Sequence, residues 1–469
     1  MTTNVTGDLA AFAAGLDFDA IPAEVRTAAK LLLLDALACA VAGDLGEETA
    51  QMQAMAAALG TSEDASLIGG GRLSLPGATM MNGYLMTAVT MCDVHRATLT
   101  HITPEVVPPA LAIAERDDAS GRDLLSAVAA GCEVTTRIGI GLDFPAFRSR
   151  GWHGPGIIGP FGSATAVGKL CGFDAETLAR AFGLAGSQAA GTYAAWGTPT
   201  VKFHQCRGAL SGLMAALLAE TGFVATQEFL TAPDGGLYNS YSNGGRPDDV
   251  VADLGSRWEL QQIGVRMWPC ATSLQNVMTA LSELVAQDDF AFDDIATATV
   301  TLGKTPFDMH GIFPNYAAKF EAMLSAHYAT AVFLRDRELT LAQFEPAAYD
   351  DPALRRFAAD SVEIALDPDL GNAQAAATVV LKDGRELTGR CDSPLGSPEN
   401  PMSFAQVEDK FRTYAKPRYS EGQIETVIDQ VGRLEDLPSV RPLIDLLREP
   451  ENPWRPTGGR AAKTIYSTN

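Results

Sequence analysis

The sequence has 469 residues, of which 46% are hydrophobic and 20% charged, a composition typical of a globular chain long enough for two or three domains. The formal net charge of -22 argues against nucleic acid and anionic membranes as partners, because both require a basic surface. The seven cysteines are odd in number and form no C-x-x-C pair, which fits a reducing cytoplasm better than a disulfide framework. We see no export signal and no apolar run of about 18 residues, so we expect a soluble, cytoplasmic protein.

Small apolar residues dominate the first half of the chain and predict helices. Residues 8–43 are expected to form two of them, with Pro22 in a first turn and Gly43 as a stop signal. Further helices are expected at about 47–59, 77–91, 106–115, 120–141, 158–171, 175–190, 206–221 and 226–230. Because few β-branched alternations interrupt this stretch, we predict a helical domain over residues 1–265.

The pattern changes after Arg266. Alternation predicts strands at 296–302 and 361–366, and Asp383-Gly384 predicts the turn of a hairpin. The remaining expected helices lie at about 273–286, 318–334, 352–359, 403–414, 420–432 and 438–447. We therefore predict an α+β lid domain over 266–395 and C-terminal helices over 396–469 that return to the helical domain. The fold class is mainly α with a smaller α+β domain.

Three of the six histidines lie in two short polar segments. His95 and His101 fall within 90–101, together with Asp93, and His153 falls within 148–164. Histidine is the side chain whose unperturbed pKa lies nearest neutrality, so this concentration predicts a proton-transfer site. The alternative is that each histidine is an ordinary surface or core residue.

Two other patterns in the sequence do not predict a ligand site. Residues 154–159 match G-x-G-x-x-G, but Trp152-His153 precede them where a buried strand would be needed, so a dinucleotide site is not predicted. His95 and His101 are six residues apart and fall off a common helical face. We therefore expect no metal site.

Several segments in order resemble the MmgE/PrpD family, which includes 2-methylcitrate dehydratases, cis-aconitate decarboxylases and iminodisuccinate epimerases. The similar segments are 21–43, 153–164, 184–191, 268–270, 400–403 and 410–411. The resemblance implies a large helical domain, an α+β lid, a homodimer, an active site in the cleft between domains, and no cofactor. It also implies a di- or tricarboxylate substrate and chemistry at a carbon next to a carboxylate.

The resemblance implies four catalytic residues: His101, His153, Tyr328 and Asp93. His101 matches the histidine after the family's acidic motif, His153 matches that of the central loop, and Tyr328 matches the lid tyrosine. Asp93 matches one carboxylate of a cluster that usually holds two adjacent acids, whereas Val94 follows here. Which histidine is the base and which the acid stays open.

The substrate-binding candidates are His95, Lys202, His204, Arg266 and Arg148. The family lysine before a Leu-His dipeptide falls on Val201, with Lys202 next to it, and the junction lysine falls on Arg266. A further family histidine or cysteine becomes Ala271. Arginine can bind a carboxylate through two hydrogen bonds, where lysine supplies a point charge. The alternatives are ion pairs or helix caps for Lys202 and Arg266, and a core role for His204.

These observations predict a cofactor-independent lyase, dehydratase-like, that abstracts a proton next to a carboxylate. Epimerisation and decarboxylation are the alternatives, and the missing second acid favours epimerisation over hydration chemistry. A non-catalytic ligand-binding protein on the same fold is a third possibility. We also expect a homodimer through the helical domain, because its Ala- and Gly-rich helices offer more apolar surface than one small lid can cover.

Overall fold

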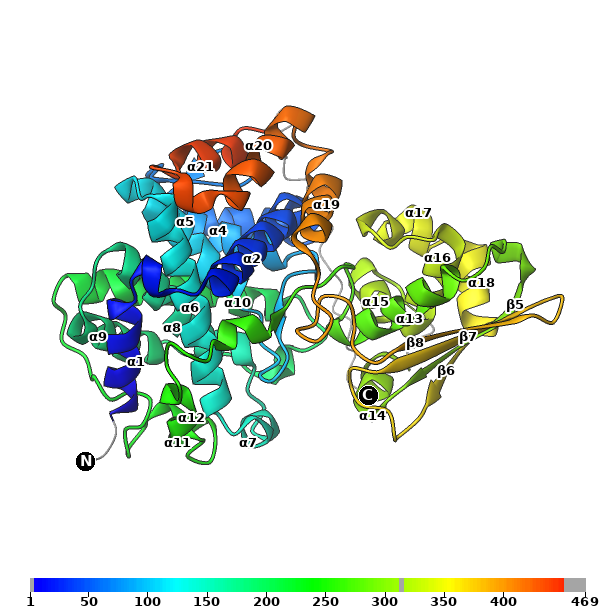
Figure 1. Cartoon of the computed structure of the whole chain (residues 1–469), viewed down its shortest axis with the longest axis horizontal. Helices are drawn as coiled ribbons and strands as arrows, with labels where there is room; N and C mark the ends of the chain where they lie inside the picture. The colour runs from blue at the N-terminus through cyan, green and yellow to red at the C-terminus, as the bar shows by residue number, and fades with distance from the viewer. Residues whose placement is uncertain (1–3, 312–315, 451–469) are drawn as a thin grey trace. The chain divides into compact units, whose positions relative to one another are not determined.

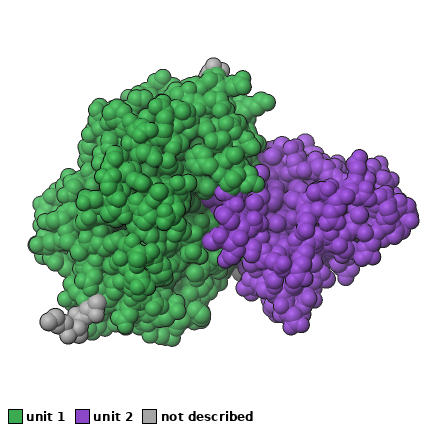
Figure 2. Space-filling model, in the orientation of Figure 1, with its two compact units in different colours: residues 1–264, 403–469 green, residues 265–402 purple. Residues whose placement is uncertain are grey.

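The computed structural model describes residues 4–311 and 316–450 (Figure 1). The chain divides into two compact units, residues 1–264 with 403–469, and residues 265–402 (Figure 2). The first unit is mainly helical and the second holds the only larger sheet among the described residues. The predicted fold class, mainly α with a smaller α+β part, is confirmed. Within the described ranges, no helix is both long and apolar enough to span a bilayer.

The first unit is built around helices that are buried on nearly all sides. Helix α8 packs against α6, α9 and α10, and it is buried from Gly154 to Gly168. Alanine and glycine along these helices allow the backbones to approach closely. The helices of this unit are α1 (Val5–Gly15), α2 (Ala23–Val41), α3 (Thr49–Ala58), α4 (Leu75–Thr87), α5 (Thr103–Asp117), α6 (Gly121–Gly141), α7 (Phe144–Ser149), α8 (Gly154–Leu170), α9 (Ala175–Gly186), α10 (Thr200–Glu220), α11 (Leu237–Tyr241), α12 (Pro247–Val251), α19 (Phe404–Ala415), α20 (Glu421–Gly432) and α21 (Arg441–Arg448).

Several features of this unit differ from the sequence prediction, among them α10, which begins at Thr200 and not at the predicted 206. The unit contains two short antiparallel pairs, β1 (Ala65–Ser66) with β2 (Arg72–Leu73), and β3 (Val94–His95) with β4 (Ile263–Gly264). Two-residue strands carry too little alternation to be detected in a sequence. The predicted helix at 226–230 is wrong: its backbone bonds elsewhere, with Leu230 N donating to Thr6 Oγ1. Helix α8 begins at Gly154, several residues before its predicted start at 158.

The second unit is a four-stranded mixed sheet with helices packed on it. The strand order is β6-β5-β7-β8; β5 and β6 are parallel and the other pairs are antiparallel. Helix α13 packs on β7 and β8, and α16 and α18 pack on β6 (Figure 1). The strands are β5 (Ile295–Leu302), β6 (Val362–Leu366), β7 (Ala375–Leu381) and β8 (Glu386–Cys391). The helices are α13 (Gln275–Val285), α14 (Lys304–His310), α15 (Lys319–Leu324), α16 (Ala326–Asp336), α17 (Pro346–Tyr349) and α18 (Pro352–Asp360).

Two expectations for this region need adjustment. The helix predicted at 318–334 is two helices, because Ser325 breaks the run and its side chain caps α16 by accepting from Tyr328 N. Residues 396–402, which the sequence places with the C-terminal helices, cluster with the second unit. The reason is that Val265 N donates to Gly396 O and so holds this turn against the start of the same unit.

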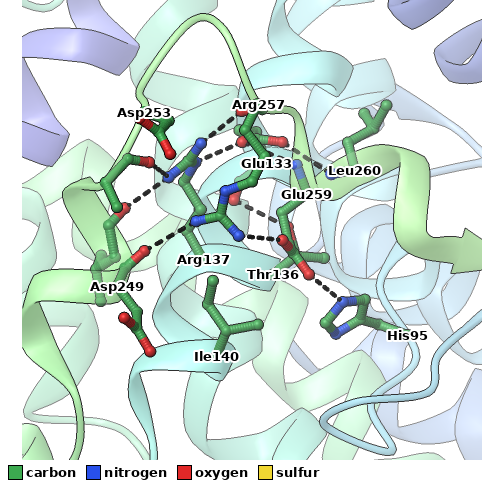
Figure 3. Close-up of polar contacts among 12 residues, drawn as sticks. His95, Glu133, Thr136, Arg137, Ile140, Asp249, Asp253, Arg257, Glu259 and Leu260 are labelled. Atoms are coloured by element: carbon green, nitrogen blue, oxygen red, sulfur yellow. Dashed lines mark hydrogen bonds and ion pairs between the residues drawn. The ribbon is translucent and has the colours of Figure 1, made fainter.

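A buried ionic network binds residues 250–260, the segment that precedes β4 (Figure 3). Glu133 and Arg137 lie one turn apart on α6, and neither side chain is exposed. The Glu133 carboxylate accepts from Arg137 Nε at 2.5 Å and from the backbone N–H groups of Glu259 and Leu260 at 3.1 and 2.8 Å. The Arg137 guanidinium donates in turn to the carbonyls of residues 250, 252 and 257. These bonds pair every charge with a partner, which is the condition for burying an ion pair.

Replacing Glu133 with Gln should therefore destabilise the protein strongly. The variant leaves the buried Arg137 charge without its carboxylate, and breaking such a pair typically costs about 3–5 kcal/mol. Urea unfolding measures the loss. The matched control is Glu425→Gln, which removes a carboxylate from the exposed pair with Arg412 and should change stability little. Equal effects of the two variants would contradict the prediction.

Candidate active site

His153 is held at the beginning of α8 by a short backbone pairing with residues 191–193. Tyr193 N donates to Gly151 O at 2.7 Å, and His153 N donates to Gly191 O at 3.1 Å. Gly151 has a φ of +81°, which favours glycine at this turn. His153 is the N-cap residue of α8 and uses its ring for no capping bond. The backbone is therefore fixed on both sides while the imidazole stays available.

The rings of His153 and His204 form a hydrogen-bonded pair. His204 lies in the first turns of α10, and the two Nδ1 atoms are 2.9 Å apart. Because a hydrogen bond between two nitrogens needs one proton, one ring carries it on Nδ1 and the other accepts. In the neutral pair, the first ring then has an unprotonated Nε2 and the second has an Nε2–H. One pair of side chains thus offers both a proton acceptor and a proton donor.

The surroundings keep this pair neutral. Burial lowers the pKa of His153 to about 3, and the nearby charges of His204, His101 and Arg148 act in the same direction. Burial, followed by the Arg207 charge, also lowers the pKa of His204. The N-terminal end of α8 likewise disfavours a positive charge on its N-cap residue. At pH 7 both rings are therefore uncharged.

His101 joins this pair from the segment before α5. Its Nδ1 lies 2.6 Å from Asp93 O and 3.6 Å from the Cys92 sulfur. Since a carbonyl only accepts, the neutral ring carries its proton on Nδ1, and Nε2 is the basic nitrogen. The Asp93 carboxylate caps α5: it accepts from the backbone N–H groups of Ile102 and Thr103 and from the Thr103 hydroxyl. Burial raises the Asp93 pKa, whereas these hydrogen bonds and His101 lower it.

Three predicted residues of the first unit are engaged in other contacts. His95 is fully buried; its Nδ1 lies 2.9 Å from Thr98 Oγ1 and its Nε2 lies 3.1 Å from Glu259 (Figure 3). The ring therefore belongs to the buried ionic network. Lys202 forms an ion pair with Glu48 at 2.9 Å. Arg148 lies over the Tyr193 ring, with its guanidinium carbon 3.0 Å from the ring centre, and it stays close enough to His153 to affect its pKa.

The other two predicted residues lie in the second unit. The Tyr328 side chain is fully buried, and its hydroxyl donates to Gln343 O. Burial raises the Tyr328 pKa further above its usual range. Arg266 is buried as well and donates from Nη1 to Cys270 O at 3.3 Å. The structure therefore brings together His101, His153, His204, Asp93 and Arg148, but His95, Lys202, Tyr328 and Arg266 have protein partners of their own.

The glycine motif at 154–159 serves helix packing. It lies inside α8, where a Cβ on Gly156 would come within 2.1 Å of Ala190 O. A Cβ on Gly159 would come within 2.0 Å of the Glu105 carboxyl. Sequence reasoning missed Tyr193, whose ring centre lies 6.1 Å from that of His153, and Glu105, whose carboxyl packs against Gly159 of α8. A signal for Glu105 exists, since it is the single charge between Ile102 and Ala114.

No group of three or more His, Cys, Asp or Glu residues able to hold a metal ion exists within the described ranges.

Comparison with known proteins decides the family. Residues 7–249 match the MmgE/PrpD N-terminal domain, and residues 268–435 match the MmgE/PrpD C-terminal domain. The chain belongs to the MmgE/PrpD family. Among curated members, the cis-aconitate decarboxylase of Aspergillus terreus is 27% identical over 480 residues, which cover 96% of both chains. The human cis-aconitate decarboxylase is 28% identical over 476 residues, covering 97% of this chain and 96% of its own.

This protein should lose stability in acid, partly because of His153. Its folded pKa lies below that of the unfolded chain, so its contribution is complete above about pH 6.5 and is lost as the pH falls toward 3. Replacing His153 with Gln removes this proton uptake on unfolding. Thermal unfolding between pH 7 and 4 should therefore show a smaller acid-induced drop in Tm for the variant. An identical pH dependence for the two proteins would contradict a neutral, buried His153.

Proposed function

We propose that this chain is a lyase that acts on an unsaturated di- or tricarboxylate and removes one carboxylate as CO2. The observation that carries the proposal is the neutral pair of His153 and His204 beside His101 and Arg148. The names of the full-length relatives, cis-aconitate decarboxylases, support the same substrate class. A tricarboxylate such as cis-aconitate is thus the first substrate to test.

Decarboxylation needs a proton donor at the site. The C–C bond to the leaving carboxylate breaks, its electron pair stays on the carbon framework, and the double bond and remaining carboxylates spread the charge. A proton must then bond to carbon, so each turnover consumes one proton and releases one CO2. In the neutral pair, one ring presents an Nε2–H that can supply this proton. Its Nδ1 then accepts the proton that bridges the two rings.

Arg148 supports the binding of a carboxylate beside this pair, because its charge acts on His153. Its position over Tyr193 orients the guanidinium, and its charge favours an anionic group near His153. A substrate carboxylate bound there would raise the pKa of His153. Lys202 remains a candidate for binding another carboxylate, and it must first exchange its ion pair with Glu48.

Elimination of water or epimerisation is the second candidate, because the other ring of the pair presents an unprotonated Nε2. That nitrogen can abstract a proton next to a carboxylate, as the dehydratase-like prediction requires. The same two rings can therefore support decarboxylation, elimination or epimerisation. The reaction depends on which bond to the substrate carbon breaks.

A substrate panel in deuterated water separates these reactions. Hydroxy and unsaturated di- and tricarboxylates, cis-aconitate among them, are incubated with the protein and followed by proton NMR. Loss of CO2 with deuterium on carbon indicates decarboxylation, a new vinyl proton without CO2 release indicates elimination, and exchange without mass change indicates epimerisation. No turnover of any substrate would contradict the proposal.

Replacing His153 with Gln should abolish most of the activity. Glutamine keeps a hydrogen-bonding group but neither holds nor moves a proton, so kcat should fall by roughly two to four orders of magnitude while KM changes little. The matched control is His310→Gln, a buried histidine of the second unit whose Nδ1 bonds to Leu324 O. This control should keep its turnover. A fully active His153 variant would move the proton transfer to His101 or His204.

The proposal includes a homodimer formed through the first unit. Helix α10 and the residues after it expose Met214, Leu218, Phe223 and Val224 at 39–85% of their surface. Replacing Met214 with Glu would place a charge in this apolar patch and should shift the mass measured by light scattering from dimer to monomer. The control is Leu366→Glu, which alters an exposed apolar residue of the second unit. A wild-type protein of about 49.5 kDa in solution would contradict the dimer.

A further inference from the structure

Glu105 is a buried carboxyl that neither the sequence prediction nor the proposed mechanism uses. It lies in the first turn of α5, and the residue is fully buried. Both of its carboxyl oxygens lack a hydrogen-bond partner among the described residues. Glu115, at the other end of the same helix, differs: it accepts from Ser66 and from Arg72. Whether the Glu105 carboxyl is protonated therefore depends on the groups around it.

The groups around Glu105 make a negative charge there unfavourable. Its carboxyl lies 2.0 Å from where a Cβ on Gly159 of α8 would be and 3.1 Å from where a Cβ on Gly208 of α10 would be, so both helices come close to it at a glycine. The titratable and charged groups that act on it are Cys92, Asp93, Cys206 and Arg207. Arg207 is the one cation among them.

Arg207 uses its guanidinium for other contacts. It donates to the carbonyls of Gln188, Gly156 and Ala190 and to the Ser211 hydroxyl, at 2.7–3.0 Å. It therefore ties the start of α8 to the segment before α10 and forms no hydrogen bond with Glu105. A buried carboxylate without a hydrogen bond is strongly disfavoured relative to its protonated form.

Asp93 and Glu105 form a pair of nearby acids in different surroundings. Burial raises the pKa of Asp93, and the three hydrogen bonds that Asp93 accepts at the start of α5 oppose this shift and favour its carboxylate form. Burial, followed by the charge of Asp93, raises the pKa of Glu105 well above its usual range. When the pKa values of two neighbouring acids are shifted apart in this way, the acid with the higher pKa holds the proton at neutral pH.

The elements that carry the three histidines meet at Glu105. Gly208 follows His204 by one turn on the same face of α10, and Gly159 lies on the helix that His153 caps. Asp93, whose charge acts on Glu105, accepts the hydrogen bond of His101 through its backbone carbonyl. The buried acid thus packs against the two helices that carry His153 and His204, and its own helix follows His101 in the chain.

We propose that Glu105 is a positioning residue that stores the proton consumed by the histidine site in each turnover. This inference rests on the proposed function. When one ring of the pair gives its Nε2 proton to the substrate carbon and takes the bridging proton on Nδ1, the other ring must gain a proton. Because no hydrogen bond joins Glu105 to the rings among the described residues, Glu105 releases that proton through an intervening water and becomes a carboxylate. It then takes a proton from solvent by the same kind of route, so one solvent proton is consumed for each CO2 released.

The test compares Glu105→Gln with the matched control Glu115→Gln on the same helix. Infrared spectra of the wild type at pH 7 should contain a carboxylic-acid band that Glu105→Gln loses and Glu115→Gln keeps. Because the raised pKa makes wild-type stability fall as the pH rises above about 4.5, Glu105→Gln should have the higher Tm at pH 7, with the difference disappearing near pH 4.5. Glu115→Gln breaks an ion pair and should have a lower Tm at pH 7.

The kinetic readout separates a functional from a structural role. Glu105→Gln should lower kcat about tenfold to a hundredfold with KM unchanged, although the protein is more stable. Glu115→Gln should keep the wild-type kcat. Full turnover of Glu105→Gln would overturn the proton store and leave the proposed function standing. A carboxylic-acid absorption that is the same in Glu105→Gln and the wild type would also overturn it, and this readout applies even if no substrate of the panel is turned over.

Discussion

The close approach of α8 to its neighbours is the constraint on which the site depends. Glycines at the contacts leave no room for a side chain: a Cβ on Gly162 would come within 1.8 Å of Thr135 Oγ1, and one on Gly212 within 2.3 Å of Pro160 O. These contacts fix α8 against α6 and α10. The position of α8 in turn brings its N-cap histidine to hydrogen-bond distance of the histidine on α10. Widening either contact would separate the two rings.

The first unit divides its buried ionisable groups into two kinds. Fully paired charges connect distant segments, as Lys410 does with Asp35 at 2.6 Å and Arg137 does with Glu133. The paired rings of His153 and His204 differ, because burial lowers the pKa of both and keeps them neutral, and Glu105 has a carboxyl that lacks a hydrogen-bond partner among the described residues. Paired charges stabilise a particular arrangement, whereas neutral titratable groups can exchange protons without leaving an ion unpaired.

This division favours chemistry in which a proton moves within the protein before it reaches the substrate. A neutral pair of rings can give a proton at one end and accept one at the other, so neither ring has to become an isolated ion in a buried site. The proposed decarboxylation fits this behaviour because it consumes one proton per turnover. The family membership and the relatives' names point to the same class of carboxylate substrate.

The sequence by itself determined the helical character of the first unit, the strands predicted at 296–302 and 361–366, the hairpin turn at Asp383-Gly384, and the family. These features follow from composition, from periodicity and from motifs that are local in the chain. The residues His101, His153 and His204 were also named from the sequence, because each stands in a recognisable segment.

Only the tertiary structure decided how these residues are used. The pairing of His153 with His204 joins positions 51 residues apart, and the bond between His95 and Glu259 spans 164 residues. Whether a histidine is neutral in a site or fixed in an ionic network depends on which partners the helices bring to it. The same holds for Glu105, which by its place in a first helical turn resembles an ordinary surface acid. Burial and long-range contacts set the protonation of a side chain, and neither is encoded in the residues next to it.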